Sequence, residues 1–123
     1  MLKLLFSPYG RLNRAKFWWA TLAVLAVDAV FLIGFFVEAA SIPEGESPPT
    51  WAIVALVPIA IVLIASFVSH FFIGIKRYHD HSKSGVWVLV QFVPAVGGLW
   101  YFIEAGCMRG INDANQYGAD PLA

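Results

Sequence analysis

The chain has 123 residues, of which 59% are hydrophobic and 13% charged, and its formal net charge is zero. A soluble domain usually carries about 25% charged residues, because a small domain has much surface to cover with polar groups. The composition therefore argues against an ordinary soluble domain. With only eight lysines and arginines in all, it also argues against a nucleic-acid partner.

The first sixteen residues hold four cations, Lys3, Arg11, Arg14 and Lys16. Their beginning, MLKLLFSPYGRL at 1–12, fits a short amphipathic helix on a membrane surface, and a disordered tail fits it equally well. We expect a polar segment that precedes the first apolar span.

Three long apolar runs make up most of the remaining chain. About 20 residues of helix cross the roughly 30 Å of bilayer hydrocarbon, whereas open sheet edges are costly in lipid. The sequence therefore predicts a single all-α membrane domain with three transmembrane helices. The predicted segments are a cytoplasmic N-terminal segment (1–16), a first span (17–37), an outer loop (38–50), a second span (51–75), a cytoplasmic loop (76–85), a third span (86–105) and a tail (106–123).

The third span is interrupted by Pro94, Gly97 and Gly98. Proline removes a backbone hydrogen bond and glycine loosens a helix. Two forms of this span stay open: a bent helix that crosses the bilayer, and a re-entrant pair of half-helices.

The distribution of lysine and arginine predicts the orientation. Cations occupy both 1–16 and 76–85, whereas 38–50 holds three glutamates and no cation. The N-terminus and the 76–85 loop are therefore expected in the cytoplasm. The tail lies outside if the third span crosses, and in the cytoplasm if that span is re-entrant.

Asp28 lies near the centre of the first span. An ionised carboxylate at that depth is costly unless it is paired or solvated, and it faces the protein interior by default. Its role is either a proton or ion site or a packing contact. Counting about 1.5 Å per helical residue places Pro94 to Gly97 at a similar depth, so we expect Asp28 to face that broken turn.

A stripe of small or polar residues follows the second span: Ser66, His70, Gly74 and Arg77 recur at helical spacing. Such stripes let membrane helices pack closely and hydrogen-bond across the contact. Gln91 in the third span has a matching depth. A hydrogen bond between His70 and Gln91 is therefore predicted, with a proton relay as the alternative role of His70.

The stretch IKRYHDHSKSG, at 75–85, places cations, imidazoles and a carboxylate between two apolar spans. His79, Asp80 and His81 are metal ligands by type, but adjacent positions do not converge on one ion, and a structural zinc site needs about four ligands. No metal, cofactor or catalytic residue is therefore predicted. We interpret the stretch as a polar turn in which Asp80 pairs with an arginine and Ser84 caps the third helix, with the cations facing anionic head groups.

Three polar segments occur in order along the chain: GRLNRAKFWW at 10–19, KRYHDHSKSGVW at 76–87 and GINDANQYGADP at 110–121. Together they resemble the small bacterial inner-membrane proteins grouped as domain of unknown function 805 (DUF805), of the YhaH type, over nearly the whole chain. The resemblance implies an inner-membrane location and this fold, and no established activity. The matching positions are Gly10, Arg11, Asn13, Arg14, Phe17, Trp18, Arg77, His79, Asp80, Ser84, Gly85, Trp87, Asn115, Tyr117, Gly118, Asp120 and Pro121.

The chain departs from this family pattern at a few positions. Lys76 replaces a usual arginine, Tyr78 replaces leucine and Val86 replaces a tryptophan. Arg77, His79 and Asp80 are intact.

Arg11 and Arg14 precede the first span on the same predicted side of the membrane as Asp80. We expect one of them to pair with Asp80 and so to bridge the two cytoplasmic segments.

We interpret the chain as an integral inner-membrane protein that acts as a non-enzymatic accessory or interaction subunit. The alternatives are a small oligomeric transporter or channel with Asp28 in its path, and a membrane enzyme that uses His79 and Asp80. Because three helices do not enclose a wide pore alone, self-association or a larger membrane partner is expected. The functional cluster in the leading interpretation consists of Arg11, Arg14, Arg77, His79, Asp80 and Ser84.

Overall fold

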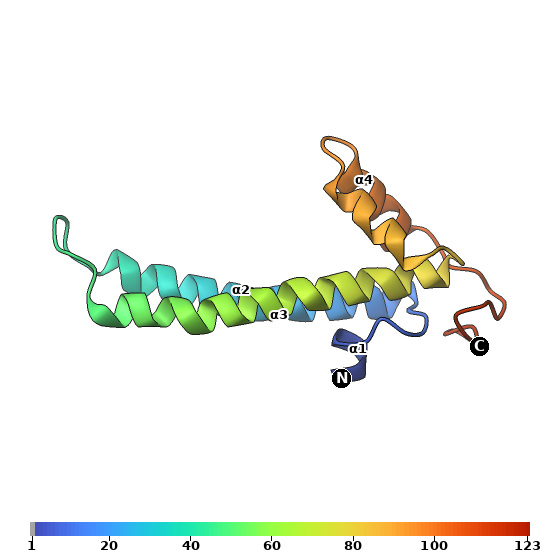
Figure 1. Cartoon of the computed structure of the whole chain (residues 1–123), viewed down its shortest axis with the longest axis horizontal. Helices are drawn as coiled ribbons and strands as arrows, with labels where there is room; N and C mark the ends of the chain where they lie inside the picture. The colour runs from blue at the N-terminus through green and yellow to red at the C-terminus, as the bar shows by residue number, and fades with distance from the viewer. Residues whose placement is uncertain (1) are drawn as a thin grey trace.

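Residues 2–123 are described by a computed structural model, and every regular element in this range is helical. The predicted all-α class is therefore confirmed for these residues, whose β-type pairing is confined to an isolated bridge between Asn115 and Gly118. Figure 1 shows the arrangement of the helices. In chain order they are α1 (Leu2–Leu5), α2 (Arg14–Ala40), α3 (Thr50–Asp80), the 3-10 helix η1 (Gly85–Phe92), α4 (Gly97–Tyr101) and the π-helix η2 (Phe102–Cys107).

Helices α2 and α3 lie side by side along the long axis of the molecule (Figure 1). Asn13 begins α2, because its side chain accepts a hydrogen bond from the Lys16 amide at 2.9 Å. Ser41 ends α2 by donating its hydroxyl to the Glu38 carbonyl at 2.6 Å. Both helices are long and apolar enough to cross a membrane.

Helix α3 extends further than the predicted second span. It continues through residues 76–80, which were predicted as the beginning of a loop, and ends at Asp80. The side chains of Lys76, Arg77 and Asp80 are buried, so contacts with other segments stabilise this last turn.

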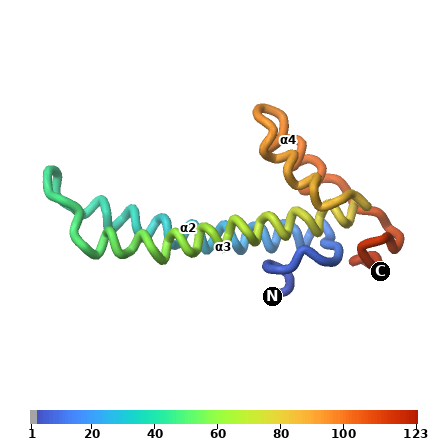
Figure 2. The backbone as a smooth tube through the Cα atoms, viewed as in Figure 1, coloured from blue at the N-terminus to red at the C-terminus, as the bar shows by residue number. Residues whose placement is uncertain are grey.

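The third apolar run forms a hairpin of short helices in place of one spanning helix over the predicted range 86–105. η1 and α4 pack against each other, joined by a turn near Pro94 (Figure 2). Ala95 adopts a φ of 68°, in the left-handed region that reverses the chain. Gly97 lies so close to η1 that a Cβ atom there would be 2.0 Å from the Val90 carbonyl oxygen. The structure thus has a helical hairpin at the segment for which the sequence left a bent helix and a re-entrant pair of half-helices open.

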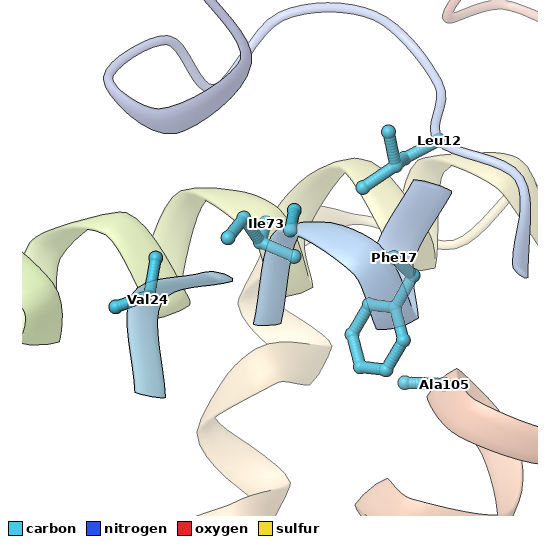
Figure 3. Close-up of a cluster of buried hydrophobic side chains, with 6 residues drawn as sticks. Leu12, Phe17, Val24, Ile73 and Ala105 are labelled. Carbon is cyan, nitrogen blue, oxygen red and sulfur yellow. The ribbon is translucent and has the colours of Figure 1, made fainter. Parts of the chain in front are cut away.

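The hydrophobic core lies where α2, α3 and η2 meet, at the end of the molecule where α3 ends (Figure 3). Further along α2 and α3 the large side chains are exposed, as at Val30 (71%) and Ile64 (65%). An apolar surface of this extent is typical of a membrane-embedded helix pair. The core residues are Leu12, Phe17, Ala20, Val24, Ile73 and Ala105.

The N-terminal lead-in begins with one helical turn, α1. The Lys76 ammonium donates to the carbonyls of Lys3 and Leu4 at 2.7 and 2.6 Å. Cations favour the carbonyl end of a helix, so Lys76 fixes this turn against α3. Of the two forms predicted for 1–12, the helical one is present over Leu2–Leu5, and Met1 lies outside the described residues.

Candidate functional site

Arg77 is the centre of a polar cluster at the end of α3, and its side chain is completely buried. Its Nε donates to the Ala105 carbonyl at 2.6 Å, and Nη1 donates to Asp80 Oδ2 at 2.5 Å and to the Leu12 carbonyl at 3.3 Å. Nη2 donates to the Met108 carbonyl. One guanidinium thus joins the N-terminal segment, α3, η2 and the tail.

Asp80 lies between two arginines and is 3% exposed. Oδ1 accepts from Arg11 Nε at 3.1 Å, while Oδ2 accepts from Arg77. The main-chain carbonyl of Asp80 accepts from the Ile111 amide at 3.0 Å. Gly110 packs directly on the carboxylate, because a Cβ atom at this position would lie 1.9 Å from Oδ2. Arg11, Arg77 and Asp80 are called the arginine cluster below.

The C-terminal tail wraps around Arg11. Nη1 of Arg11 donates to the Asp113 carbonyl at 2.6 Å and to that of Gly118 at 3.3 Å, and Nη2 donates to the Ile111 carbonyl at 2.5 Å. Arg14 instead donates to the Cys107 carbonyl at 2.9 Å. Of the two pairings predicted for Asp80, the pair with Arg11 is the one present.

His79 joins the cluster to the tail through its ring. The imidazole stacks on Tyr117 with 3.8 Å between centroids and 4° between planes. Its Nδ1 lies 3.2 Å from the Gly10 carbonyl oxygen. Asn115 Nδ2 donates to the His79 carbonyl at 2.8 Å and to Ser82 Oγ at 2.9 Å. The family resemblance contains Asn115 and Tyr117, but their spacing in the sequence does not reveal these contacts.

Two neighbours of the cluster complete the turn after α3. The Ser84 hydroxyl accepts from the Val86 amide at 3.4 Å and caps η1, as predicted. Burial lowers the pKa of His81, and the nearby charge of Arg77 lowers it further. A neutral imidazole is therefore favoured at neutral pH.

The cluster is built to hold segments together. Both carboxylate oxygens of Asp80 already accept hydrogen bonds from an arginine. A general base must reach the proton that it removes, so Asp80 in this arrangement is suited to a structural role and not to that of a general base. In the described part of the chain, no group of three or more His, Cys, Asp or Glu side chains has the spacing of a metal site. A hollow of about 260 Å³ beside Asp80 is lined by residues that include Arg14, Arg109 and Asn112.

The polar side chains inside the long helices have partners other than those predicted. Asp28 Oδ1 accepts from Ser66 Oγ at 2.6 Å, so Asp28 faces α3 and not the turn at Pro94 to Gly97. That prediction was wrong because the third apolar run folds back and does not run alongside the middle of α2. A transport role of Asp28 stays a prediction.

His70 bonds within its own helix. Its Nδ1 lies 3.0 Å from the Ser66 carbonyl oxygen. Across residues 2–123 we find no hydrogen bond between His70 and Gln91, which lies in η1. The depths do match, since Phe92 of η1 stacks on Phe71 of α3 with 6.4 Å between ring centroids, but the His70 ring contacts a carbonyl of its own helix and not Gln91.

An ion pair that was not predicted from the sequence lies at the base of the hairpin. Lys83 donates to Glu104 Oε1, and Trp100 Nε1 donates to Oε2 at 2.6 Å. Lys83 also lies 4.7 Å from the ring centroid of Trp87, at cation–π distance. A third span that crossed the bilayer would instead place Glu104 near the opposite membrane surface. The breaks at Pro94 and Gly97 were the signal for this pair, since a reversal there brings residues 83 and 104 together.

Comparison with known proteins gives a consistent set of matches. A family model described as a protein of unknown function (DUF805) matches residues 5–119. The chain is 30% identical over 112 residues to inner membrane protein YhaI of Escherichia coli K12, covering 91% of this chain and 83% of that protein. YhaI of Escherichia coli O157:H7 matches with the same identity and coverage. No solved structure matches the chain.

Proposed function

Because the chain belongs to the DUF805 family, we propose that it is a small inner-membrane protein that serves as a non-enzymatic accessory or interaction subunit. Helices α2 and α3 cross the bilayer, and the arginine cluster lies at its cytoplasmic surface. The name of the relative YhaI supports the location, and two helices of sufficient length and apolarity support the crossing.

The observation that carries this proposal is the internal satisfaction of the arginine cluster. The donors of Arg11 and Arg77 reach Asp80 and carbonyls of the same chain. Such a network is suited to fixing a shape, because buried polar groups that have all their partners make a structure rigid.

The shape that the cluster fixes is a polar surface beside the membrane. The tail and the start of α2 present side chains there that are exposed to solvent. We call this surface the polar platform, and a second protein is the partner that it suits. The platform consists of Arg14, Arg109, Asn112, Asp113 and Gln116.

The orientation follows from the charges. Cations at the N-terminus and in the last turn of α3 lie at the same end as the platform, whereas Glu44 and Glu46 lie in the loop at the other end. The positive-inside rule therefore supports a cytoplasmic platform.

The experiment is affinity purification of the tagged protein in native lipid particles, followed by mass spectrometry. The double substitution Arg109→Glu with Asn112→Lys changes the platform at exposed positions. We expect it to remove a co-purifying protein that the unmodified chain retains. Glu46→Lys, exposed in the opposite loop, serves as the matched control and should retain that protein. An identical set of proteins with both variants would contradict the proposal.

A further inference from the structure

We propose that residues 85–107 enter and leave the bilayer through one surface, as a hairpin embedded in the leaflet next to the arginine cluster. The tail then lies on the same side as residues 10–14 and the turn after α3. This inference rests on α2 and α3 crossing the bilayer, which is part of the proposed function, and it does not depend on the accessory role.

The hairpin is too short to cross. The eight residues of η1, at about 2.0 Å of rise per residue, reach roughly 16 Å, against the roughly 30 Å of hydrocarbon in a bilayer. The returning arm of the hairpin, which consists of α4 and η2, runs back from the same turn. The hairpin therefore has the depth of a single leaflet.

Much of the backbone of the turn is hydrogen-bonded within the hairpin, which lowers the cost of placing it in lipid. The Val93 amide donates to the Val90 carbonyl at 2.9 Å, and the Val96 amide donates to the Pro94 carbonyl at 2.8 Å. The Gly97 amide donates to the Val93 carbonyl at 2.9 Å. The reversal thus needs few hydrogen bonds from water.

The side chains of the hairpin match hydrocarbon. No charged residue occurs between Lys83 and Glu104, and these two form the ion pair at the base. Large apolar side chains are exposed on both helical arms of the hairpin. A partner that covers them therefore has to present an apolar surface to several sides of the hairpin. The lipid around α2 and α3 is such a partner and is continuous with this surface. More than half of the residue's surface is exposed at Val86, Phe92, Val96, Leu99, Trp100 and Phe102.

The base of the hairpin is fixed to the end of the long helices. Arg77 donates to the carbonyls of Ala105 and Met108, and Trp18 Nε1 donates to the Gly106 carbonyl at 2.9 Å. In Figure 1 the arm labelled α4 diverges from the α2–α3 pair but slants back along its length, so that it does not extend beyond the end of the pair. If α2 and α3 stand across the membrane, this slant directs the tip into the bilayer.

The test uses single cysteines in a Cys107→Ser background, since Cys107 is exposed. The positions are Lys16 at the start of α2, Ser47 in the outer loop, Ala114 in the tail and Val96 near the tip. A membrane-impermeant maleimide is applied to spheroplasts and to inverted vesicles. We expect Lys16→Cys and Ala114→Cys to be labelled only in inverted vesicles, and Ser47→Cys only in spheroplasts. Val96→Cys should be labelled from neither side until detergent is added.

Depth gives a second measurement that does not depend on labelling from water. An environment-sensitive fluorophore on Val96→Cys should be quenched by lipids that carry a nitroxide within the acyl chain. Ala119→Cys repeats the tail measurement at another exposed position, and each variant is first checked for a single species in detergent.

Three outcomes would overturn the inference alone. The first is labelling of Ala114→Cys from the side of Ser47, and the second is labelling of Val96→Cys from water. The third is cross-linking of Val96→Cys between two copies together with loss of quenching, which would show that a second copy, and not lipid, covers the hairpin. Labelling of Lys16→Cys and Ser47→Cys from the same side would also defeat the proposed membrane crossing. Loss of a partner in the platform experiment leaves these results unchanged, so the two proposals fail separately.

Discussion

Two buried cations on the last turns of α3 show how side-chain chemistry sets the contacts of this end. Lys76 has a point-like ammonium and binds two adjacent carbonyls of α1. Arg77 has a planar guanidinium and reaches acceptors in three other segments as well as Asp80. Lysine cannot replace arginine at such a site, because only the guanidinium presents its donors in a rigid fork.

Replacing Asp80 tests the energetic weight of the arginine cluster. Asp80→Asn leaves Arg77 and Arg11 without their counter-charge, and breaking a buried pair in this way costs about 3–5 kcal/mol. We expect the free energy of unfolding, measured by denaturation in detergent, to fall by about that amount. Asp113→Asn is the control, because Asp113 is exposed and binds Arg11 through its main-chain carbonyl. Equal effects of both substitutions would show that the carboxylate of Asp80 has no special weight.

Among the secondary-structure elements, the hairpin depends on the close approach of its two helical arms, η1 and α4. Gly97 faces the carbonyl of Val90, while neighbouring Gly98 has open space around its Cα atom. Gly74 on α3 plays a similar part, since a Cβ atom there would lie 2.7 Å from both Tyr101 and Val88. Small residues at these points let the hairpin pack on itself and on α3.

A pair of substitutions separates close packing from helix propensity. Gly97→Ala should lower the free energy of unfolding by about 1–3 kcal/mol, because the new methyl group overpacks the contact with Val90. Gly98→Ala should leave it unchanged or raise it by up to about 1 kcal/mol, the usual gain in helix propensity. Both are measured by denaturation in detergent. A larger fall in the free energy of unfolding for Gly98→Ala than for Gly97→Ala would mean that η1 and α4 are not packed in this way.

For the whole molecule, the contacts between distant segments gather at one end. The N-terminal segment, the end of α3, the base of the hairpin and the tail all meet at the arginine cluster, whereas the other end is a pair of helices joined by a loop (Figure 1). Each segment therefore depends on the others for its position.

Removal of the tail tests this dependence. Truncation after Cys107 deletes acceptors of both Arg11 and Arg77, so residues 2–13 should become sensitive to trypsin at Lys3 and Arg11, with a lower melting temperature. Truncation after Asp120 is the control, because the amides of Leu122 and Ala123 bond only within that turn, to Asp120. Equal resistance of both truncated chains would show that the N-terminal segment is held without the tail.

The parts of this structure that could be predicted are those that depend on the type of side chain, such as its hydrophobicity or its charge. Long apolar runs are sufficient for α2 and α3. The charges predict that an arginine before α2 pairs with Asp80, but they do not distinguish Arg11, which makes the pair, from Arg14. The hairpin was left open because a crossing helix and a half-depth hairpin have the same apolar composition. Its turn depends on Ala95 at a φ of 68°, a conformation for which alanine gives no signal in the sequence.

The contacts of the tail were hidden for a different reason. Every hydrogen bond that Arg77 makes outside its own helix ends on a main-chain oxygen, at Leu12, Ala105 or Met108. All amino acids carry that oxygen, so the exposed Met108 can be exchanged during evolution while Arg77 keeps its acceptor. Methods that infer proximity from covarying pairs of positions would miss these hydrogen bonds of Arg77, although they hold the N-terminal segment and the tail together.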